Sequence, residues 1–493
     1  MEIVQSCRPL IPLAITFAAP FLIWLLRRNV NRREAVSFIA AALSFVSMLS
    51  MAPAVLHGTV YKVTVFTLLP GITVSFMADG LAMIFGLIAP FLWILVTSYN
   101  VGYMRGLAEH AQTRYYFCFA TAIIGALGVA MAANVFTLYL FYEIISLFTY
   151  PLVAHHQDAE AYSGARKYFV YLMGASKLFL LPAMVLTYVL CGTLDFTVGD
   201  MVHGIFPADA DPKLVTLTYI LYIAGLAKAA IMPLHNWLPS AMVAPTPVSA
   251  LLHAVAVVKA GVFSVSRIML SCFGVDLLDK LHLGLGTAYI AAFTIVVASI
   301  IALTKDDLKA RLAYSTVSQL SYVVIGVAML TPLAVQGGLM HIAHHAFSKI
   351  TLFMAAGAVF VATRQKKISL MRGLGRKMPW TFGAFSIAAL SMIGAPPVCG
   401  FVSKWYMVRG AVEINNHILL VALLASTILN AGYFGPIIYS AFFLKPAEGV
   451  LVDTYREAAP TMVAPLCLTA AVSVFLGLYP ETFLEFAKAF EVF

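Results

Sequence analysis

Charge is scarce in this sequence. Charged residues make up 11% of the 493 positions, hydrophobic residues make up 61%, and the mean hydropathy is +0.91. A folded soluble protein needs more charge than this on its surface, so the composition excludes a soluble domain and indicates a polytopic membrane protein. The net charge of +9 would suggest nucleic acid in a soluble protein. In a membrane protein the positive residues instead indicate how the chain is oriented in the bilayer, and we expect no nucleic-acid partner.

Several motifs of cofactor and enzyme chemistry are also missing. The six cysteines are scattered and contain no CxxC pair, so we expect neither an iron–sulfur cluster nor a zinc site in this chain. The sequence has no Gly-rich nucleotide loop and no Ser/His/Asp arrangement in a soluble segment. We therefore expect no cofactor, no bound metal and no catalytic chemistry in the chain itself. If its assembly oxidises a donor, another subunit does so.

The chain does contain apolar runs that are long enough to cross a lipid bilayer. A spanning helix needs roughly 20 apolar residues, and an open chain can cross lipid only as helices. We therefore expect an all-α, polytopic membrane protein with about 14 transmembrane helices in one domain, 1–493, and a retained first span rather than a cleaved leader. The expected spans lie near 10–26, 35–52, 80–99, 116–131, 134–154, 168–191, 214–232, 246–271, 283–303, 312–330, 336–362, 380–408, 418–444 and 461–479.

The polar loops indicate which way the chain crosses the membrane. Lys and Arg gather in the loops after odd-numbered spans, such as Arg27 and Arg28 after the first, whereas the acidic loop around Asp209 follows an even-numbered span. Positively charged loops stay on the cytoplasmic side. We therefore expect the odd-numbered loops inside and both termini outside.

A few ionisable residues lie inside the apolar runs. A charge at the centre of a bilayer costs at least about 2.5 kcal/mol, so several such residues indicate a polar path through the protein. Arg267 lies near an outer helix end and is expected to snorkel, and Asp79 suits a helix N-terminus. Glu143 is the only acid deep within a span. The deeper basic residues are Lys177, Lys228, Lys259, Lys349 and Lys404.

The segment HIAHHAFSKITLF at 341–353 concentrates such residues. His341, His345 and Lys349 are four positions apart, so a helix places them on one face, while His344 falls elsewhere. A row of titratable groups on one face provides the short steps that a proton relay requires. The alternative is that each histidine simply bonds to nearby backbone, but the row and the other buried lysines favour the relay.

Two apolar runs contain prolines that should break their helices. GLAKAAIMPLHNWLPS at 225–240 and GAPPVCGFVSKWY at 394–406 each lie close to a lysine, Lys228 or Lys404. Backbone groups freed within the membrane are tolerated only where protein or water satisfies them. Paired broken helices, here the seventh and twelfth, are typical of inverted-repeat transporters. We expect two inverted five-helix repeats, 115–271 and 282–444; ordinary proline kinks are the alternative.

Glu143 needs a positively charged partner if it is buried. Lys177 and Lys228 are the buried cations nearest to it in the sequence. Pairing would keep one lysine protonated, and weakening the pair would favour release of its proton. We therefore expect this pair to start a relay that continues through Lys259.

Together these motifs resemble the antiporter-like subunits shared by respiratory complex I (NADH:quinone oxidoreductase), membrane-bound hydrogenases and Mrp cation/proton antiporters. The matching stretches are MADGLAMIF at 77–85, the helix around FYEIISLFTY, AKAAIMPLHNWLPSAMVAPTPVSALLHAVAVVKAG at 227–261, HIAHHAFSK and GAPPVCGFVSKW. The resemblance covers nearly the whole chain. It implies ion transport in a prokaryotic inner (plasma) membrane, with other membrane subunits of a hetero-oligomeric complex as partners.

The resemblance also implies roles for individual residues. Glu143 matches the essential glutamate of the fifth helix, and Lys228 matches the lysine that pairs with it. Lys259 matches the central lysine of the eighth helix, preceded by a histidine at His253. The remaining matches are the relay of the eleventh helix and the charged residue of the broken twelfth helix, at His345, Lys349 and Lys404.

The resemblance leaves more than one complex open. The distal subunit of complex I has a long C-terminal lateral helix that this sequence lacks, and the middle subunit typically has glutamate at the position of Lys404. The chain therefore looks most similar to MrpD or to the related subunits of hydrogenase complexes, and the general antiporter-like class is favoured over any one complex. Na⁺/H⁺ exchange and redox-driven proton pumping both remain open, although a row of lysines favours protons, because a Na⁺ site would need oxygen ligands. A solute transporter and a haem-binding electron carrier are the alternatives from other classes.

Overall fold

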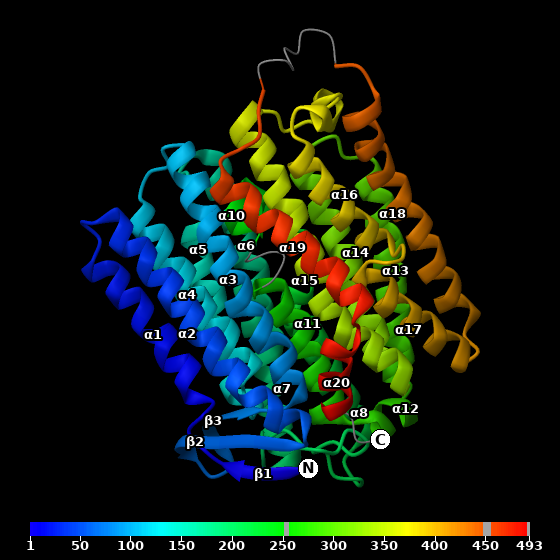
Figure 1. Cartoon of the computed structure of the whole chain (residues 1–493). Coiled ribbons are helices and arrows are strands. Elements are labelled where there is room, and N and C mark those ends of the chain that lie inside the picture. Colours follow the sequence, from blue (N-terminus) through cyan, green and yellow to red (C-terminus); the bar gives the residue numbers. More distant parts are fainter. Residues whose placement is uncertain (251–255, 447–454, 491–493) are drawn as a thin grey trace.

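The computed structural model describes residues 1–250, 256–446 and 455–490. Its helices form a single bundle in which most axes run roughly side by side (Figure 1). The N-terminus, a small sheet and the last helix, α20 (Glu481–Phe490), lie at one end of the bundle. The loops after α3 and α5 lie at the opposite end, away from the N-terminus.

Many of these helices satisfy the length and hydropathy of a membrane span. Within the part of the chain that the structure describes, nine helical segments are long and apolar enough to cross a bilayer. They are α2 (Val30–Leu56), α3 (Gly80–Gly106), α4 (Gln112–Ala130), α5 (Val135–Val153), the continuous segment Ala159–Cys191 formed by α6 and α7, α13 (Leu283–Leu303), α15 (Pro332–Thr363), α18 (His417–Phe443) and α19 (Pro460–Leu478).

The other helices are shorter or more polar, and several of them are parts of interrupted segments. The longer ones are α1 (Leu10–Leu25), α8 (Pro212–Gly225), α11 (Val257–Ile268), α14 (Leu308–Ala328), α16 (Pro379–Ile393) and α17 (Cys399–Glu413). The short ones are α9 (Trp237–Ser240), α10 (Thr246–Val248) and α12 (Val275–Lys280). The chain is mostly helical, as predicted.

Polar side chains fix where several helices begin. Asn134, Thr331 and Asn416 accept a backbone N–H bond at the starts of α5, α15 and α18, which satisfies one of the amides left free at each helix N-terminus. Asp79 does the same for α3, with its Oδ1 2.8 Å from the nitrogen of Ala82. The prediction that Asp79 begins a helix is confirmed.

The all-α prediction missed a three-stranded sheet. Strands β1 (Glu2–Gln5), β2 (Thr59–Leu69) and β3 (Ile72–Ala78) pair in that order, β1 parallel and β3 antiparallel to β2. The stretch TVYKVTVFTLLPGITVSFMA is rich in β-branched residues and contains a Pro70–Gly71 turn, in which Gly71 has a φ of +76°. Both features favour a hairpin. A search for apolar runs of 20 residues overlooks strands of this length.

Two helices break where prolines were expected to interrupt them. α8 ends at Gly225 and is followed by a 3₁₀ turn at Ala227–Ala229. α16 ends at Ile393, and α17 starts again at Cys399. Each break places a lysine, Lys228 or Lys404, beside irregular backbone inside the bundle.

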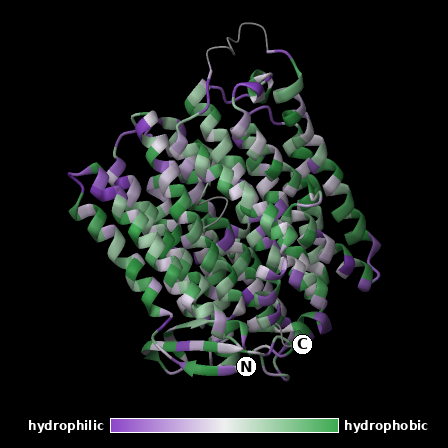
Figure 2. Cartoon of the chain, viewed as in Figure 1, coloured by the Kyte–Doolittle hydropathy of each residue, from purple (hydrophilic) through white to green (hydrophobic). Residues whose placement is uncertain are grey.

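The bundle is hydrophobic along most of its length. Figure 2 shows the hydrophilic positions gathered at the two ends, with a smaller number inside the hydrophobic region. Those interior positions include the buried lysines and histidines described below.

Candidate functional site

Helix α15 carries the predicted row of titratable groups. The side chains of His341, His345 and Lys349 are fully buried, and the rings of the two histidines have their centroids 6.0 Å apart. His344 does not join this row, because neither of its ring nitrogens has a hydrogen-bond partner in the described part of the chain. The spacing of four residues thus gives one continuous polar face in a buried helix.

The row on α15 is joined to α11 by a short hydrogen bond. The Nζ atom of Lys259 lies 2.6 Å from Nδ1 of His345. His341 continues the series, with its Nδ1 2.8 Å from Oγ of Ser403 and its Nε2 3.1 Å from Oε1 of Gln319. An amine and two imidazoles therefore follow one another in a region with no solvent exposure.

Lys404 occupies the break between α16 and α17. Its Nζ atom donates to the carbonyl oxygens of Met392, at 2.6 Å, and Ile393, at 3.2 Å. In an uninterrupted helix these carbonyls would accept from residues 396 and 397, but both are prolines and have no N–H to donate. The lysine satisfies backbone groups that the prolines leave free, so its position follows from the break.

A second series of polar side chains leads from Lys349 to the carbonyl oxygen of Met392, which also accepts from Lys404. The Nζ atom of Lys349 donates to Ser315, at 2.7 Å, and Tyr433 donates to Ser315 at 3.0 Å. Tyr433 also contacts Asn430, whose Nδ2 atom lies 3.1 Å from the oxygen of Met392. Lys349 and Lys404 are thus connected through side chains of α14 and α18.

Lys228 lies in the other break and is also fully buried. Its Nζ atom donates to the carbonyl oxygen of Tyr142, at 2.8 Å, and to Oγ of Ser146, at 2.6 Å. The amine also lies 3.2 Å from the centroid of the Tyr142 ring, a favourable site for a cation. Lys228 is therefore held against α5, the helix that carries Glu143.

The ion pair of Glu143 differs from the one that the resemblance implies. Oε2 of Glu143 lies 2.8 Å from Nζ of Lys177, which also donates to the hydroxyl of Tyr139 at 2.7 Å. Lys228, the expected partner, bonds instead to Tyr142 and Ser146. The side chain of Lys177 is 48% exposed and that of Glu143 is 14% exposed. The prediction that Lys177 is deeply buried was therefore wrong. Lys177 belongs to the π-helical turn Ser176–Leu180, and the exposure of its side chain places the pair at the outside of the bundle.

Arg267 does not snorkel towards solvent. Its side chain is fully buried, and its two terminal nitrogens lie 2.5 and 2.8 Å from the carboxylate oxygens of Asp79. The prediction was wrong because two ionic residues far apart in the sequence satisfy each other, which removes the need to reach water. His253, another predicted relay residue, lies outside the described residues.

The site also contains uncharged polar residues that were not predicted from the sequence. Gln319, Ser315, Asn430 and Tyr433 are buried and connect the charged groups. Gln319 and Asn430 are amide side chains inside apolar helices, which is a usable signal. Serine and tyrosine are too common in membrane helices to be singled out by sequence.

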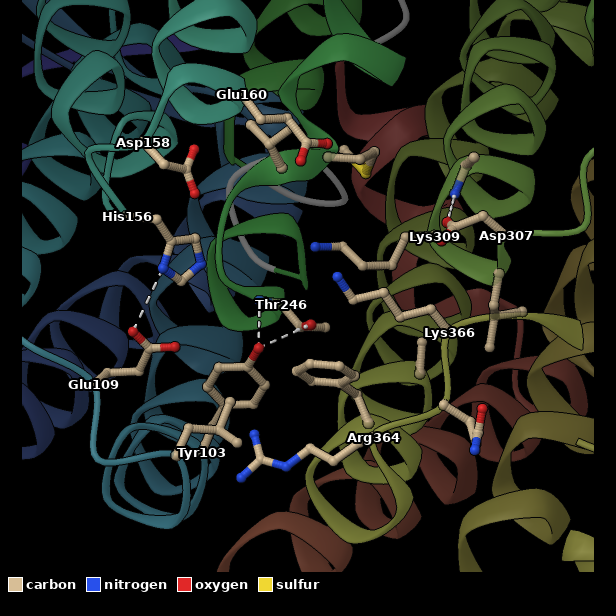
Figure 3. Close-up of a pocket in the computed structure, with 18 of the residues that line it drawn as sticks. Tyr103, Glu109, His156, Asp158, Glu160, Thr246, Asp307, Lys309, Arg364 and Lys366 are labelled. Atoms are coloured by element: carbon tan, nitrogen blue, oxygen red, sulfur yellow. Dashed lines mark hydrogen bonds and ion pairs between the residues drawn. The ribbon is translucent and has the colours of Figure 1, made fainter. Parts of the chain in front are cut away.

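A pocket of about 590 Å³ opens at the end of the bundle opposite the N-terminus. In Figure 3, Glu109 and His156 line one side, and Lys309, Lys366 and Arg364 approach from the other. Burial opposes ionisation of Glu109, but the facing imidazoles of His155, His156 and His110 outweigh this effect and lower its pKa. The pocket thus presents an ionised carboxylate opposite a basic wall.

A comparison with known families decides what kind of protein carries this site. A family model described as "NADH:quinone oxidoreductase/Mrp antiporter, TM" matches residues 132–430, which is more than half of the chain. The chain belongs to this family. The matched region contains every predicted relay residue, from Glu143 to Lys404.

Individual relatives of this antiporter-like membrane protein span the same family. NADH-quinone oxidoreductase subunit N of Desulforudis audaxviator (strain MP104C) is 32% identical over 492 residues, which cover 96% of this chain and 95% of the relative. A probable K(+)/H(+) antiporter component, of type A/B, from Rhizobium meliloti (strain 1021) is 30% identical over 468 residues. These residues cover 91% of this chain but only 45% of that longer relative.

Solved structures agree with this assignment. A chain of the membrane-bound sulfane sulfur reductase, an archaeal respiratory membrane complex, superposes with a TM-score of 0.87 at 26% identity, covering 98% of this chain and 97% of that one. A chain of the Mrp complex from Dietzia sp. DQ12-45-1b has a TM-score of 0.85 at 21% identity, covering 98% and 96%, and shows the shared fold. The predicted superfamily is confirmed, whereas the narrower resemblance to MrpD stays a prediction.

Proposed function

We propose that this protein moves protons across the membrane as one subunit of a larger membrane complex. The observation that carries the proposal is the hydrogen-bonded contact between Lys259 and His345, which joins the buried amine of α11 to the buried row on α15. Buried amines and imidazoles that bond to one another can pass protons over short distances. A structural role alone would not require so many ionisable groups in one hydrophobic region.

The proposed route begins at Glu143 and ends at the break between α16 and α17. From the pair of Glu143 and Lys177 it passes to Lys228, to Lys259 with His253 before it, and then to the row on α15. It ends at Lys404. The α15 row consists of His341, His345 and Lys349. Water completes the steps where no direct hydrogen bond joins two neighbours.

The ion pair of Glu143 is suited to act as the switch. Moving one charge through 100 mV corresponds to about 2.3 kcal/mol. Two opposite charges 4 Å apart, at an effective dielectric constant near 20, interact by roughly 4 kcal/mol. Opening or closing such a pair can therefore drive one proton step. Because Lys177 and Glu143 lie at the outside of the bundle, a neighbouring membrane protein of the complex is in a position to act on them.

The partners of the chain follow from its relatives. Both solved neighbours are chains of multisubunit complexes, so we infer that this chain also works with other membrane subunits. A redox-driven proton pump and a Na⁺/H⁺ exchanger are the two candidate assemblies. The described relay is built from nitrogen donors, which favours protons over Na⁺, since Na⁺ requires oxygen ligands.

The proposal includes a specific arrangement in a prokaryotic plasma membrane. We infer about 14 spans, with inverted five-helix repeats at 115–271 and 282–444, and both termini on the outer side. Two features support this arrangement: each repeat contains one broken helix followed by a lysine, Lys228 or Lys404, and the loops opposite the N-terminus are rich in Lys and Arg.

Glu143→Gln in the assembled complex tests the function directly. The complex is reconstituted into vesicles, and proton movement is followed with a pH-sensitive dye while the driving reaction or Na⁺ gradient is applied. We expect the variant to lose most of its proton movement, because glutamine cannot hold Lys177 as an ion pair. Glu413→Gln at the exposed end of α17 is the matched control and should pump normally. Full proton movement by Glu143→Gln would contradict the proposal.

A further inference from the structure

One glutamate and three histidines lie close together at the end of the bundle opposite the N-terminus. Glu109 and His110 lie in the loop between α3 and α4, and His155 and His156 lie in the loop after α5. These residues belong to neither the buried relay nor the breaks. Glu109, His110 and His156 line one edge of the pocket, and Figure 3 shows Glu109 and His156 facing each other. His155 is buried beside them, with its ring centroid 4.7 Å from that of His110.

The donor atoms of these side chains have the spacing of a metal site. One ligand atom each from Glu109, His110 and His155 can be chosen so that all three lie within 4.8 Å of one another. Nε2 of His155 is 3.6 Å from Oε2 of Glu109, and Nδ1 of His156 is 3.7 Å from the same oxygen. Ligands bound at about 2.0–2.1 Å in a tetrahedron are separated by roughly 3.3–3.4 Å. Small side-chain rotations would therefore complete the geometry.

The state of His155 supplies an independent reason to expect a ligand. Its side chain has 0% exposure, yet neither ring nitrogen has a hydrogen-bond partner in the described chain. Buried polar groups are nearly always hydrogen-bonded, so an imidazole whose contact with Oε2 of Glu109, at 3.6 Å, is longer than a hydrogen bond needs an explanation. The backbone carbonyl of His155 accepts separately from Arg114 at 3.1 Å, and that bond does not involve the ring.

We propose that Glu109, His110 and His155 bind a divalent transition-metal ion of the Zn²⁺ type, with His156 available as the fourth ligand. Imidazole nitrogens with one carboxylate suit Zn²⁺ and its neighbours in the periodic table. Ca²⁺ and Mg²⁺ require mainly oxygen ligands and do not fit this set. The site uses no cysteine, which is why the spacing of cysteines did not indicate it.

Metal binding here would connect two loops that belong to different helix pairs. It would also neutralise Glu109, which faces Lys309, Arg364 and Lys366 across the pocket. Asp158, on the same side as His156, adds negative charge that partly offsets the basic wall. The binding site itself does not depend on the proposed proton transport, and its test needs no transport measurement.

The experiment measures metal binding by the full chain, purified in detergent without a polyhistidine tag and treated with a chelator. Zn²⁺ affinity is measured by titration calorimetry. Co²⁺ then reports the geometry, because its visible absorption is much stronger in a tetrahedral site than in water. We expect one Zn²⁺ per chain and a tetrahedral Co²⁺ spectrum.

Three variants identify the ligands. His155→Ala removes the buried ligand, while His110→Ala and Glu109→Gln change groups that are at least partly exposed and should leave the fold intact. Loss of an outer-shell partner already weakens a metal site about 10–100-fold, so we expect each variant to lose at least about 10-fold in Zn²⁺ affinity. His203→Ala is the matched control, because His203 lies beside Asp200 and Asp276 on an exposed loop.

The outcomes separate the proposal from a purely structural role of these residues. Selective weakening in the three variants, with normal affinity in His203→Ala, supports the site. Equal Zn²⁺ affinity in wild type, His110→Ala and Glu109→Gln would overturn it, as would an octahedral Co²⁺ spectrum in the wild type. Failure of the proposed proton transport would leave these results unchanged.

Discussion

Lys259 on α11 and His345 on α15 form a hydrogen bond of 2.6 Å, although they lie 86 residues apart in the sequence. When Lys259 donates to Nδ1, that nitrogen is unprotonated, and a neutral imidazole then carries its own proton on Nε2. A proton accepted from Lys259 at Nδ1 can leave from Nε2 on the other side of the ring. The contact therefore has the geometry of a relay step, and it links the two proposed repeats.

His345→Gln should block this step. Glutamine preserves hydrogen bonding but cannot accept a proton at one atom and release it from another. We expect proton movement in vesicles containing the complex to fall about 100-fold, within the range lost when a proton-transfer group is removed. His344→Gln changes a neighbouring buried histidine whose ring nitrogens have no hydrogen-bond partner among the described residues, and it should keep near-normal transport. Equal effects of the two variants would contradict the relay role.

Lys404→Met should affect both transport and stability. The carbonyl of Ile393 would lose its donor, and that of Met392 would keep only the amides of Asn430 and Gln319. An unpaired buried polar group costs about 1–3 kcal/mol, so we expect a lower melting temperature in detergent as well as loss of proton movement. Arg409→Gln on the same helix is exposed and should change neither.

Lys404→Arg separates the two effects. Arginine can still donate to the carbonyls but does not release its proton at any accessible pH. We therefore expect its melting temperature to stay close to that of the wild type while proton movement is lost. Normal transport by this variant would show that Lys404 serves only the backbone.

The local features of the site follow from the sequence, because they depend on spacing along one helix. The positions of His341, His345 and Lys349 fix a common face, and the prolines at 396 and 397 fix the break. Even the identity of the two free carbonyls can be worked out from the missing N–H groups. These predictions need no knowledge of how the helices pack.

Contacts between helices could not be predicted in this way. Lys177 and Lys228 are both reasonable partners for Glu143 in the sequence, and only the folded structure shows that Lys177 of the π-helical turn pairs with it. Arg267 gives the same lesson, since hydropathy cannot reveal that Asp79 lies opposite. The strands have 4, 11 and 7 residues, which is shorter than a membrane span, so the apolar runs do not reveal the sheet, although the sequence contains its Pro70–Gly71 turn.

The stability of the protein should depend on Asp79 and Arg267 being paired with each other, and much less on either charge being present. Removing one partner of a buried ion pair costs about 3–5 kcal/mol, whereas replacing both by apolar residues can be close to neutral. We expect Asp79→Asn to lower the melting temperature strongly, and Asp79→Asn with Arg267→Met to recover much of the loss. Thermal melting of the purified chain in detergent measures both. A double variant as unstable as the sum of its parts would contradict this pairing.

Gly261 controls how closely α11 approaches the broken segment around Lys228. A Cβ atom at this position would meet the backbone of Lys228 and Ala229, including the oxygen of Lys228 at 2.7 Å. Backbone cannot move aside as a flexible side chain can, so Gly261→Ala should cost about 1–3 kcal/mol, the usual range for overpacking. We also expect slower proton movement, because Lys228 would shift relative to Lys259.

Gly286→Ala on α13 is the matched control. Among the described residues, a Cβ there meets no atom within 4 Å apart from its chain neighbours and its own helix backbone, so this variant should be neutral or raise stability by up to about 1 kcal/mol. Equal melting temperatures for the two variants would show that α11 does not depend on this close approach.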